Sequence, residues 1–242
     1  MTEFKDATDE DRKAYAEVAR YLSRDAEAKK ILSEIDKEKI TVHIIHDRHN
    51  QYDPKTRTID WDPQSALAVV DGDGKFVGVQ SAAMALIHEG AHATDRHLTK
   101  HLETNNAAYQ NDAEAHAVGV EDRVAKTLGE PQRFNHFGTP LGEADSTEHT
   151  RTRQDGSVHW VDAEGKVGGT YLPGTLPEKA PRMSWFSFES GSDSPVGKIG
   201  REMDAARDYV RALQQSRGGE AAAPPASDQG LAMRAAQQRG RD

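Results

Sequence analysis

The chain has 242 residues, of which 36% are hydrophobic, with a mean hydropathy of −0.80 and a formal net charge of −9. This length suits one sizeable domain with polar extensions, or two small domains. The acidic balance argues against nucleic acid and anionic membranes as partners, because both require a basic surface, and the absence of cysteine excludes disulfides and cysteine-ligated metals.

Two patterns bear on targeting. No apolar run approaches the ~20 residues of a transmembrane helix. The acidic stretch MTEFKDATDEDRKAYAE lacks the apolar segment of a secretory signal peptide. If the protein is exported, we therefore expect a route that does not read such a signal.

The first elements are predicted to be two helices followed by a strand. Thr8 followed by Asp11 is an N-terminal capping pattern, and apolar residues then recur at helical spacing. Ser23 or Asp25 is expected to cap the second helix. The period then changes, because Lys39–Asp47 is short and rich in β-branched residues, which predicts a strand.

Turn residues punctuate the next segments. Thr56–Trp61 is predicted as a strand, preceded by a turn at Asp53-Pro54 and ended by Pro63. The stretch ALAVVDGDGKFVG (66–78) surrounds an Asp-Gly-Asp-Gly turn, and we interpret it as a loop in preference to a strand pair.

Two longer helices are predicted next. The pattern is helical from Gln80 to about Leu102, and again over Ala113–Leu128, where Gly129 and Pro131 end it. Within the first of these, the sequence ALIHEGAHATD contains His-Glu-x-x-His.

The His-Glu-x-x-His pattern predicts a zinc site. Residues four apart on a helix differ by about 40° around its axis, so His88 and His92 project side by side, as two ligands of one zinc ion must. Glu89 then reaches the open side of the metal and can act as a general base on water. The alternative is a chance pattern in a chain with 11 histidines, but this helix is built of small residues suited to burial against a sheet.

A zinc site of this kind requires a third protein ligand. His97 and His101 lie one turn further along the predicted helix, would point away from the metal, and are interpreted as solvated. The helix Ala113–Leu128 offers Glu114 and Glu121 on one face, about 10 Å apart along the axis and too far apart to share one metal. The residues alone leave open which glutamate is the ligand, or whether both are ordinary surface residues.

The segments ALIHEGAHA, AEAHAVG and EDRVAKTLGEPQR together resemble the zinc metallopeptidase effectors that Gram-negative bacteria inject through secretion systems. These are zincins, and a more distant similarity is to the clostridial neurotoxin light chains. The resemblance covers roughly residues 40–140. It implies that Glu114 is the third ligand, that Glu121 braces the site, and that Arg133 is catalytic. His136 falls where the family has a tyrosine; histidine can also donate to an oxyanion, but it loses its proton near neutral pH.

The resemblance implies hydrolysis of peptide bonds in a protein or peptide substrate, with Zn²⁺ as cofactor. Glu89 would take a proton from the metal-activated water, while Arg133 and His136 stabilise the oxyanion. We expect the substrate to add as a strand to a sheet edge, for which Thr56–Pro63 is the candidate. Trp61 is expected either to line a pocket or to lie in the core.

Two alternatives stay open. One is a zinc amidase that acts on another amide, such as a peptidoglycan cross-link. The other is a non-catalytic translocated binding protein whose metal site is structural or a chance pattern. Glu89 discriminates between catalysis and binding, because a structural site has no use for an acid beside an open coordination position.

The predicted fold class is α+β, a zincin-like metallopeptidase domain whose small mixed sheet packs on the active-site helix. The expected partners are the substrate, secretion machinery or an immunity protein, with neither nucleic acid nor membrane. The protein is expected to be made in the bacterial cytoplasm and then secreted or translocated into a target cell. The predicted organisation is N-terminal helices in 1–38, a catalytic core in 39–150, a hairpin and C-terminal helix in 151–215 that complete or extend the domain, and a disordered tail in 216–242.

Overall fold

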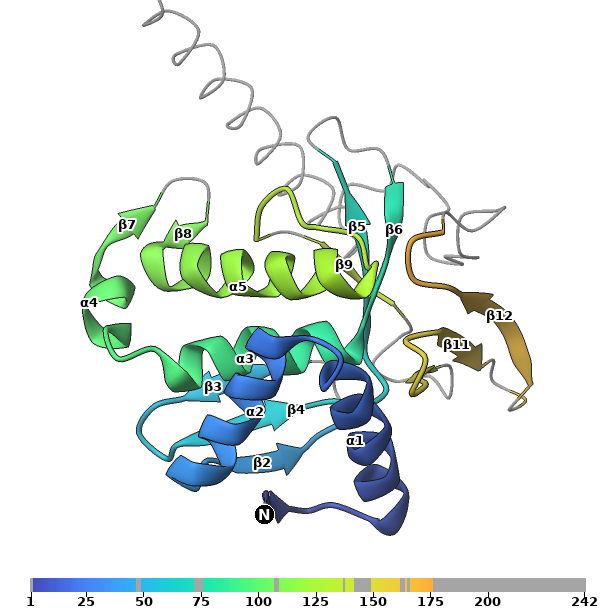
Figure 1. Cartoon of the computed structure of the whole chain (residues 1–242), viewed down its shortest axis with the longest axis horizontal. Helices are drawn as coiled ribbons and strands as arrows, with labels where there is room; N and C mark the ends of the chain where they lie inside the picture. The colour runs from blue at the N-terminus through green and yellow to red at the C-terminus, as the bar shows by residue number, and fades with distance from the viewer. Residues whose placement is uncertain are drawn as a thin grey trace, which may run out of the picture. The chain divides into compact units, whose positions relative to one another are not determined.

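The computed structural model describes residues 2–46, 49–71, 76–106, 109–136, 138–141, 149–161, 164 and 166–175. In this part of the chain, five α-helices and several small β-sheets form an α+β fold, as predicted (Figure 1). None of these five helices combines the length and the apolar composition that a membrane-spanning helix requires. The predicted C-terminal helix and the predicted tail in 216–242 lie outside the described residues.

The first two helices begin where their capping residues predict. They are α1 (Asp9–Leu22) and α2 (Ala26–Glu38). Thr8 and Asp11 form a reciprocal capping box at the start of α1. Asp25, and not Ser23, caps α2 by accepting a hydrogen bond from the Ala28 N–H at 2.8 Å.

A four-stranded mixed sheet follows these helices. Its strands are β1 (Glu3–Lys5), β2 (Thr41–Ile44), β3 (Gln51–Asp53) and β4 (Thr58–Trp61), in the order β1-β2-β4-β3. The pairs β1–β2 and β2–β4 are parallel, whereas β3 and β4 are antiparallel. The predicted strands in 39–47 and 56–61 are therefore present, with shorter bounds.

The prediction that Thr56–Pro63 is a sheet edge is wrong. Strand β4 pairs with β2 on one side and with β3 on the other, so β3 is the edge. The turn after β3 explains this pairing, because the Asp53 carboxylate accepts hydrogen bonds from the Lys55 N–H and the Thr56 hydroxyl, both at 2.9 Å. Trp61 lies fully in the core, where its indole N–H donates to the Ala82 carbonyl at 2.8 Å.

The segment interpreted as a loop is a strand pair. Strands β5 (Ala66–Val70) and β6 (Phe76–Ser81) are antiparallel, and β9 (Thr139–Pro140) pairs on the other side of β5. The apolar and β-branched residues that flank the Asp-Gly turn favour strands more strongly than the turn residues oppose them. Val69 and Val79, for example, are buried.

The long helix predicted from Gln80 to Leu102 is broken in two. The helices are α3 (Ala82–Thr94) and α4 (Leu98–Glu103). Asp95 adopts an extended conformation between them and accepts hydrogen bonds from the His97 N–H at 2.8 Å and from His101 Nδ1 at 2.7 Å. These local bonds compete with continuation of the helix.

Helix α5 (Asp112–Leu128) matches its prediction closely. It follows the short strands β7 (Asn105–Asn106) and β8 (Gln110–Asn111), and Gly129 ends it with a φ of 82°.

The main core forms around α3. Buried residues of α1, α2, β2, β4, α3 and α5 belong to one apolar cluster. Figure 1 shows α3 between α5 and the four-stranded sheet, which is the predicted packing of a small mixed sheet on this helix. Gly90 permits the close approach of α2, because a Cβ at this position would lie 2.7 Å from Ile31 Cγ2.

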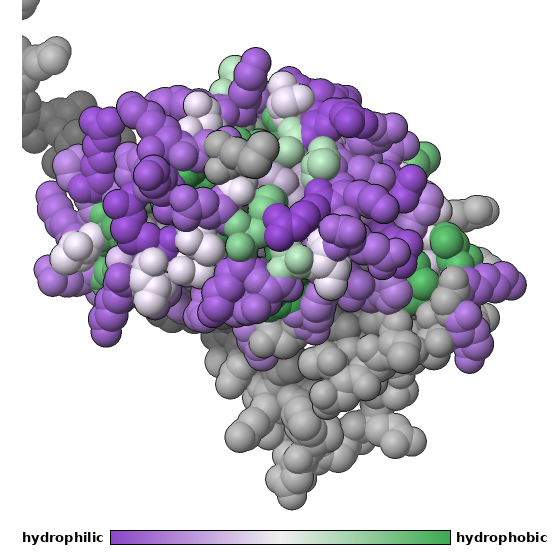
Figure 2. Space-filling model, turned by 90° about the horizontal axis from the view of Figure 1, so that it is seen from below, coloured by the Kyte–Doolittle hydropathy of each residue, from purple (hydrophilic) through white to green (hydrophobic). Residues whose placement is uncertain are grey.

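The hairpin predicted within 151–215 is present and has a third strand. Strands β10 (His149–Thr152), β11 (Val158–Val161) and β12 (Val167–Tyr171) form an antiparallel sheet in that order. Its buried residues share a second apolar cluster with β5 and β6. The predicted domain boundaries at 38, 150 and 215 stay predictions. Figure 2 shows one face of the molecule, which is mainly hydrophilic with small scattered apolar areas.

Candidate metal centre

Helix α3 carries His88, Glu89 and His92 into the interior. The side chains of His88 and His92 are only 7% and 9% exposed, and Glu89 is also buried. Most other residues of α3 are small or apolar, so neighbouring elements pack against the helix on several sides. The two imidazole rings have centroids 5.0 Å apart, as expected for side chains four residues apart on a helix.

Helix α5 lies alongside α3 and adds a carboxylate to this histidine pair. Glu114 stands in the first turn of α5, where Asn111 accepts a hydrogen bond from its N–H at 2.9 Å. Glu114 Oε2 lies 3.1 Å from His88 Nε2 and 3.3 Å from His92 Nε2. The structure thus brings together the three predicted ligands, whose donor atoms all lie within 4.8 Å of one another.

These distances fit a metal ion. Two ligand atoms bound to one zinc at about 2.0–2.1 Å in a tetrahedron lie about 3.3 Å apart. The separations of 3.1 and 3.3 Å between Glu114 Oε2 and the two imidazole nitrogens match this value. The donor set of two imidazoles and one carboxylate is also one that catalytic zinc sites use.

Glu121 lies behind the cluster and orients His88. Its side chain is 1% exposed, and its Oε2 is 2.8 Å from His88 Nδ1. In the neutral ring, Nδ1 donates to Glu121, which leaves the lone pair of Nε2 facing the carboxylate of Glu114. Two facing lone pairs repel, so this position favours a cation between the two side chains.

The charges around the cluster also favour a divalent cation. The charged groups around the cluster are the carboxylates of Glu89, Glu114 and Glu121 and the guanidinium of Arg133. In the state that binds a metal, with neutral imidazoles and ionised carboxylates, their sum is 1 − 3 = −2. A divalent ion would neutralise this buried charge, which is otherwise costly.

The pKa values of the site residues also indicate that positive charge is stabilised between the histidines and Glu114. Burial lowers the pKa of His88, but its hydrogen bonds with Glu114 and Glu121 outweigh burial and raise the pKa to about 10. Burial raises the pKa of Glu114, but hydrogen bonds with His136, His88 and His92 bring the net pKa far below its usual range. Burial raises the pKa of Glu89, the direction that suits a general base working near neutral pH.

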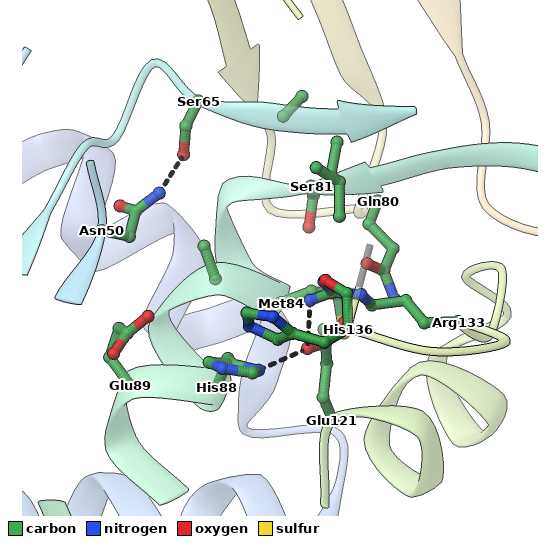
Figure 3. Close-up of a pocket in the computed structure, with 13 residues that line it drawn as sticks. Asn50, Ser65, Gln80, Ser81, Met84, His88, Glu89, Glu121, Arg133 and His136 are labelled. Atoms are coloured by element: carbon green, nitrogen blue, oxygen red, sulfur yellow. Dashed lines mark hydrogen bonds and ion pairs between the residues drawn. The ribbon is translucent and has the colours of Figure 1, made fainter. Parts of the chain in front are cut away.

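Arg133 and His136 come from the segment that follows α5. His136 Nε2 lies 3.1 Å from Glu114 Oε2, and Arg133 Nη1 lies 3.2 Å from Glu121 Oε2. Both side chains line a pocket of about 170 Å³ together with His88 and Glu89. Figure 3 shows His88 and His136 near the centre of this pocket, with Glu89 on one side and Arg133 on the other.

The pocket also contains residues that the sequence did not single out. Four polar ones are Asn50, Ser65, Gln80 and Ser81. Asn50 precedes β3, Ser65 precedes β5, and Gln80 and Ser81 end β6. These residues carry no local pattern, so only the packing of the three strands around α3 brings them to the site. His97 and His101 lie outside the cluster, because they belong to the segment beyond the break at Asp95.

No family model, curated protein or solved structure matches this chain. The resemblance to zincin effectors therefore stays a prediction.

Proposed function

We propose that this chain is a zinc-dependent metallopeptidase with a zincin-like domain, which hydrolyses peptide bonds in a protein substrate. The observation that carries the proposal is the convergence of the His88, His92 and Glu114 donor atoms within 4.8 Å. Glu89, the neighbour of the first of these residues, is buried and lines the adjacent pocket. This is the arrangement that a metal-assisted hydrolysis requires.

The side chains divide the chemistry among them. A bound Zn²⁺ supplies a Lewis acid that lowers the pKa of water and polarises a carbonyl group. Glu89 accepts the proton of the attacking water and returns it to the leaving amine. Glu121 keeps His88 in the tautomer whose Nε2 is free for the metal. Arg133 and His136 line the same pocket and stay predicted donors to the oxyanion.

The substrate backbone is proposed to pair with β3. Within the described residues, no strand pairs with the outer edge of β3, and Asn50, which precedes this strand, lines the pocket. An extended peptide can add to such an edge through main-chain hydrogen bonds. The pocket, at about 170 Å³, has room for a single side chain of the substrate.

The wider predictions are part of the same proposal. They are delivery into a target cell without a cleavable signal peptide, and contact with secretion machinery or an immunity protein; both depend on the resemblance in sequence. A zinc amidase and a non-catalytic metal-binding protein are the alternatives. Burial of Glu89 beside the metal ligands favours catalysis, because a buried carboxylate without a task is costly.

Metal analysis combined with two variants tests the proposal. We expect about one zinc per purified wild-type chain, and Glu114→Ala should lose most of it because one of three ligands is missing. Glu89→Gln should retain the zinc, yet lower peptide cleavage at least about 10²-fold, because the general base is lost. Cleavage is measured by mass spectrometry on a denatured proteome and on a peptide library.

The outcomes separate the alternatives. Zinc retention with cleavage that does not depend on Glu89 contradicts the proposed mechanism. Zinc retention without peptide cleavage favours the binding protein or the amidase, which release of amines from peptidoglycan fragments would tell apart. A wild-type chain that takes up no zinc removes the metal site altogether.

A further inference from the structure

Three imidazole nitrogens, and not two, lie against the same oxygen of Glu114. His88 Nε2 and His136 Nε2 are each 3.1 Å from Oε2, and His92 Nε2 is 3.3 Å from it. A carboxylate oxygen has two lone-pair directions, so it cannot accept three separate hydrogen bonds equally well. The three histidines must therefore have different roles.

The positions of the donor atoms divide the histidines into two groups. His88, His92 and Glu114 form the set whose donor atoms are all mutually close, and His136 does not belong to it. His136 Nε2 thus approaches Glu114 Oε2 from a different direction from the other two nitrogens. With a metal ion held by His88, His92 and Glu114, one lone pair of this oxygen would face the ion, and the other would be open to a hydrogen bond from His136 Nε2–H at 3.1 Å.

Arg133 holds the backbone of His136 in this position. Its Nη2 donates to the His136 carbonyl, and its Nη1 donates to Glu121 Oε2 at 3.2 Å. Glu121 in turn accepts from His88 Nδ1 at 2.8 Å. Residues 133–136 therefore reach both a ligand carboxylate, through His136, and a ligand imidazole, through Glu121.

We propose that His136 is a positioning residue that holds the Glu114 carboxylate toward the metal, and that it acts with Arg133 as a clamp that controls metal retention. The identity of the metal rests on the proposed function. Ligating carboxylates are oriented by outer hydrogen bonds, whose loss lowers metal affinity about 10–100-fold. This positioning role for His136 Nε2–H is an alternative to the oxyanion role that the sequence resemblance implies, and the experiments below discriminate between the two.

The zinc dissociation constant, measured by competition with a chromophoric chelator, tests the clamp. His136→Ala should bind zinc about 10–100-fold more weakly than the wild type. His136→Gln should recover most of this loss, because its amide N–H can reach the same oxygen. His101→Ala is the matched control, since His101 bonds to Asp95 outside the cluster, and should leave the dissociation constant unchanged.

Cobalt(II) substitution gives a second readout that does not depend on activity. The visible spectrum of the cobalt protein should change in His136→Ala and return toward that of the wild type in His136→Gln. Circular dichroism of the metal-free variants checks that each of them is folded.

The possible results are distinct. Wild-type zinc affinity and an unchanged cobalt spectrum in His136→Ala, with reduced cleavage, would overturn the clamp and restore the oxyanion role. Zinc binding that depends on His136 in a chain that cleaves no peptide would support the clamp while contradicting the peptidase. If the wild type binds no zinc, both proposals fall.

Discussion

Glu121 is an almost fully buried carboxylate with two partners of different kinds. It accepts a hydrogen bond from His88 Nδ1 and pairs with the guanidinium of Arg133, whose side chain is only 9% exposed. The Arg133 charge holds the pKa of Glu121 below its usual range, although burial alone would raise it. This residue therefore connects the stability of the fold to the orientation of a metal ligand.

Removal of Glu121 should destabilise the protein even without a metal. We expect Glu121→Ala to lower the free energy of unfolding of the metal-free chain by about 3–5 kcal/mol, because it leaves the Arg133 guanidinium buried and unpaired. Urea denaturation followed by circular dichroism measures this change. In the double variant Glu121→Gln with Arg133→Met, no unpaired charge remains, and the loss should be smaller. Equal losses in the two proteins would show that the ion pair is not its cause.

Helices α1, α2 and α5 were predictable because the sequence of each contains its own start and stop signals. These are a capping residue at the start, apolar residues at helical spacing and, in α5, a terminal glycine. The break between α3 and α4 was not, because Asp95 ends the helix through hydrogen bonds to His97 and His101 that a periodic pattern does not reveal. The edge position of β3 depends on pairing between strands, which lies outside any local signal.

The candidate site divides in the same way. The arrangement of His88, Glu89 and His92 was predictable because their spacing along one helix fixes the directions of their side chains. The choice between Glu114 and Glu121 depends on how α5 is rotated and shifted against α3, which the residues alone left open. The structure places Glu114 at the histidine pair and Glu121 behind it. The roles of Arg133 and His136 were predicted from the resemblance, but their contacts could be identified only in the folded structure.

The turn between β10 and β11 offers a test of packing between elements. Gly156 has a φ of +86°, and a Cβ there would lie 2.3 Å from the Tyr21 ring of α1. Gly156→Ala should lower the free energy of unfolding by about 2–5 kcal/mol, since it adds backbone strain to overpacking. Gly119→Ala is the matched control: it lies inside α5 with only an ordinary contact of 3.6 Å to Arg123. This control should be neutral or up to about 1 kcal/mol more stable, and similar losses in both variants would contradict the argument.

Glu130 joins three parts of the fold. Its carboxylate accepts hydrogen bonds at 2.8 Å from the Tyr21 hydroxyl of α1 and from the N–H and hydroxyl of Ser81, the N-cap residue of α3. The side chain thus fixes the start of the helix that carries His88 and Glu89. Burial raises the pKa of Glu130 to about 7, even though these hydrogen bonds oppose the shift.

This shift predicts how stability depends on pH. The pKa of Glu130 is about 7 in the folded state and 4.5 in its usual state, so between these values the folded chain retains a proton that the unfolded chain has released. The contribution of Glu130 to the free energy of unfolding is therefore fully present below pH 4.5 and decreases as the pH rises toward 7. The decrease should amount to about 3 kcal/mol, because one pKa unit corresponds to about 1.4 kcal/mol.

Glu130→Gln isolates this contribution. The amide oxygen can accept from the Ser81 N–H, while its NH₂ group donates to the hydroxyls of Tyr21 and Ser81, which rotate to receive it. Urea denaturation of the metal-free wild type and variant, at a series of pH values from 4 to 8, gives the difference between their free energies of unfolding. Because the other titrating groups are common to both proteins, they cancel in this difference, which should shift in favour of the variant as the pH rises to 7. A difference that is constant across the range would mean that Glu130 is ionised throughout, and that its three hydrogen bonds outweigh the cost of burying its charge.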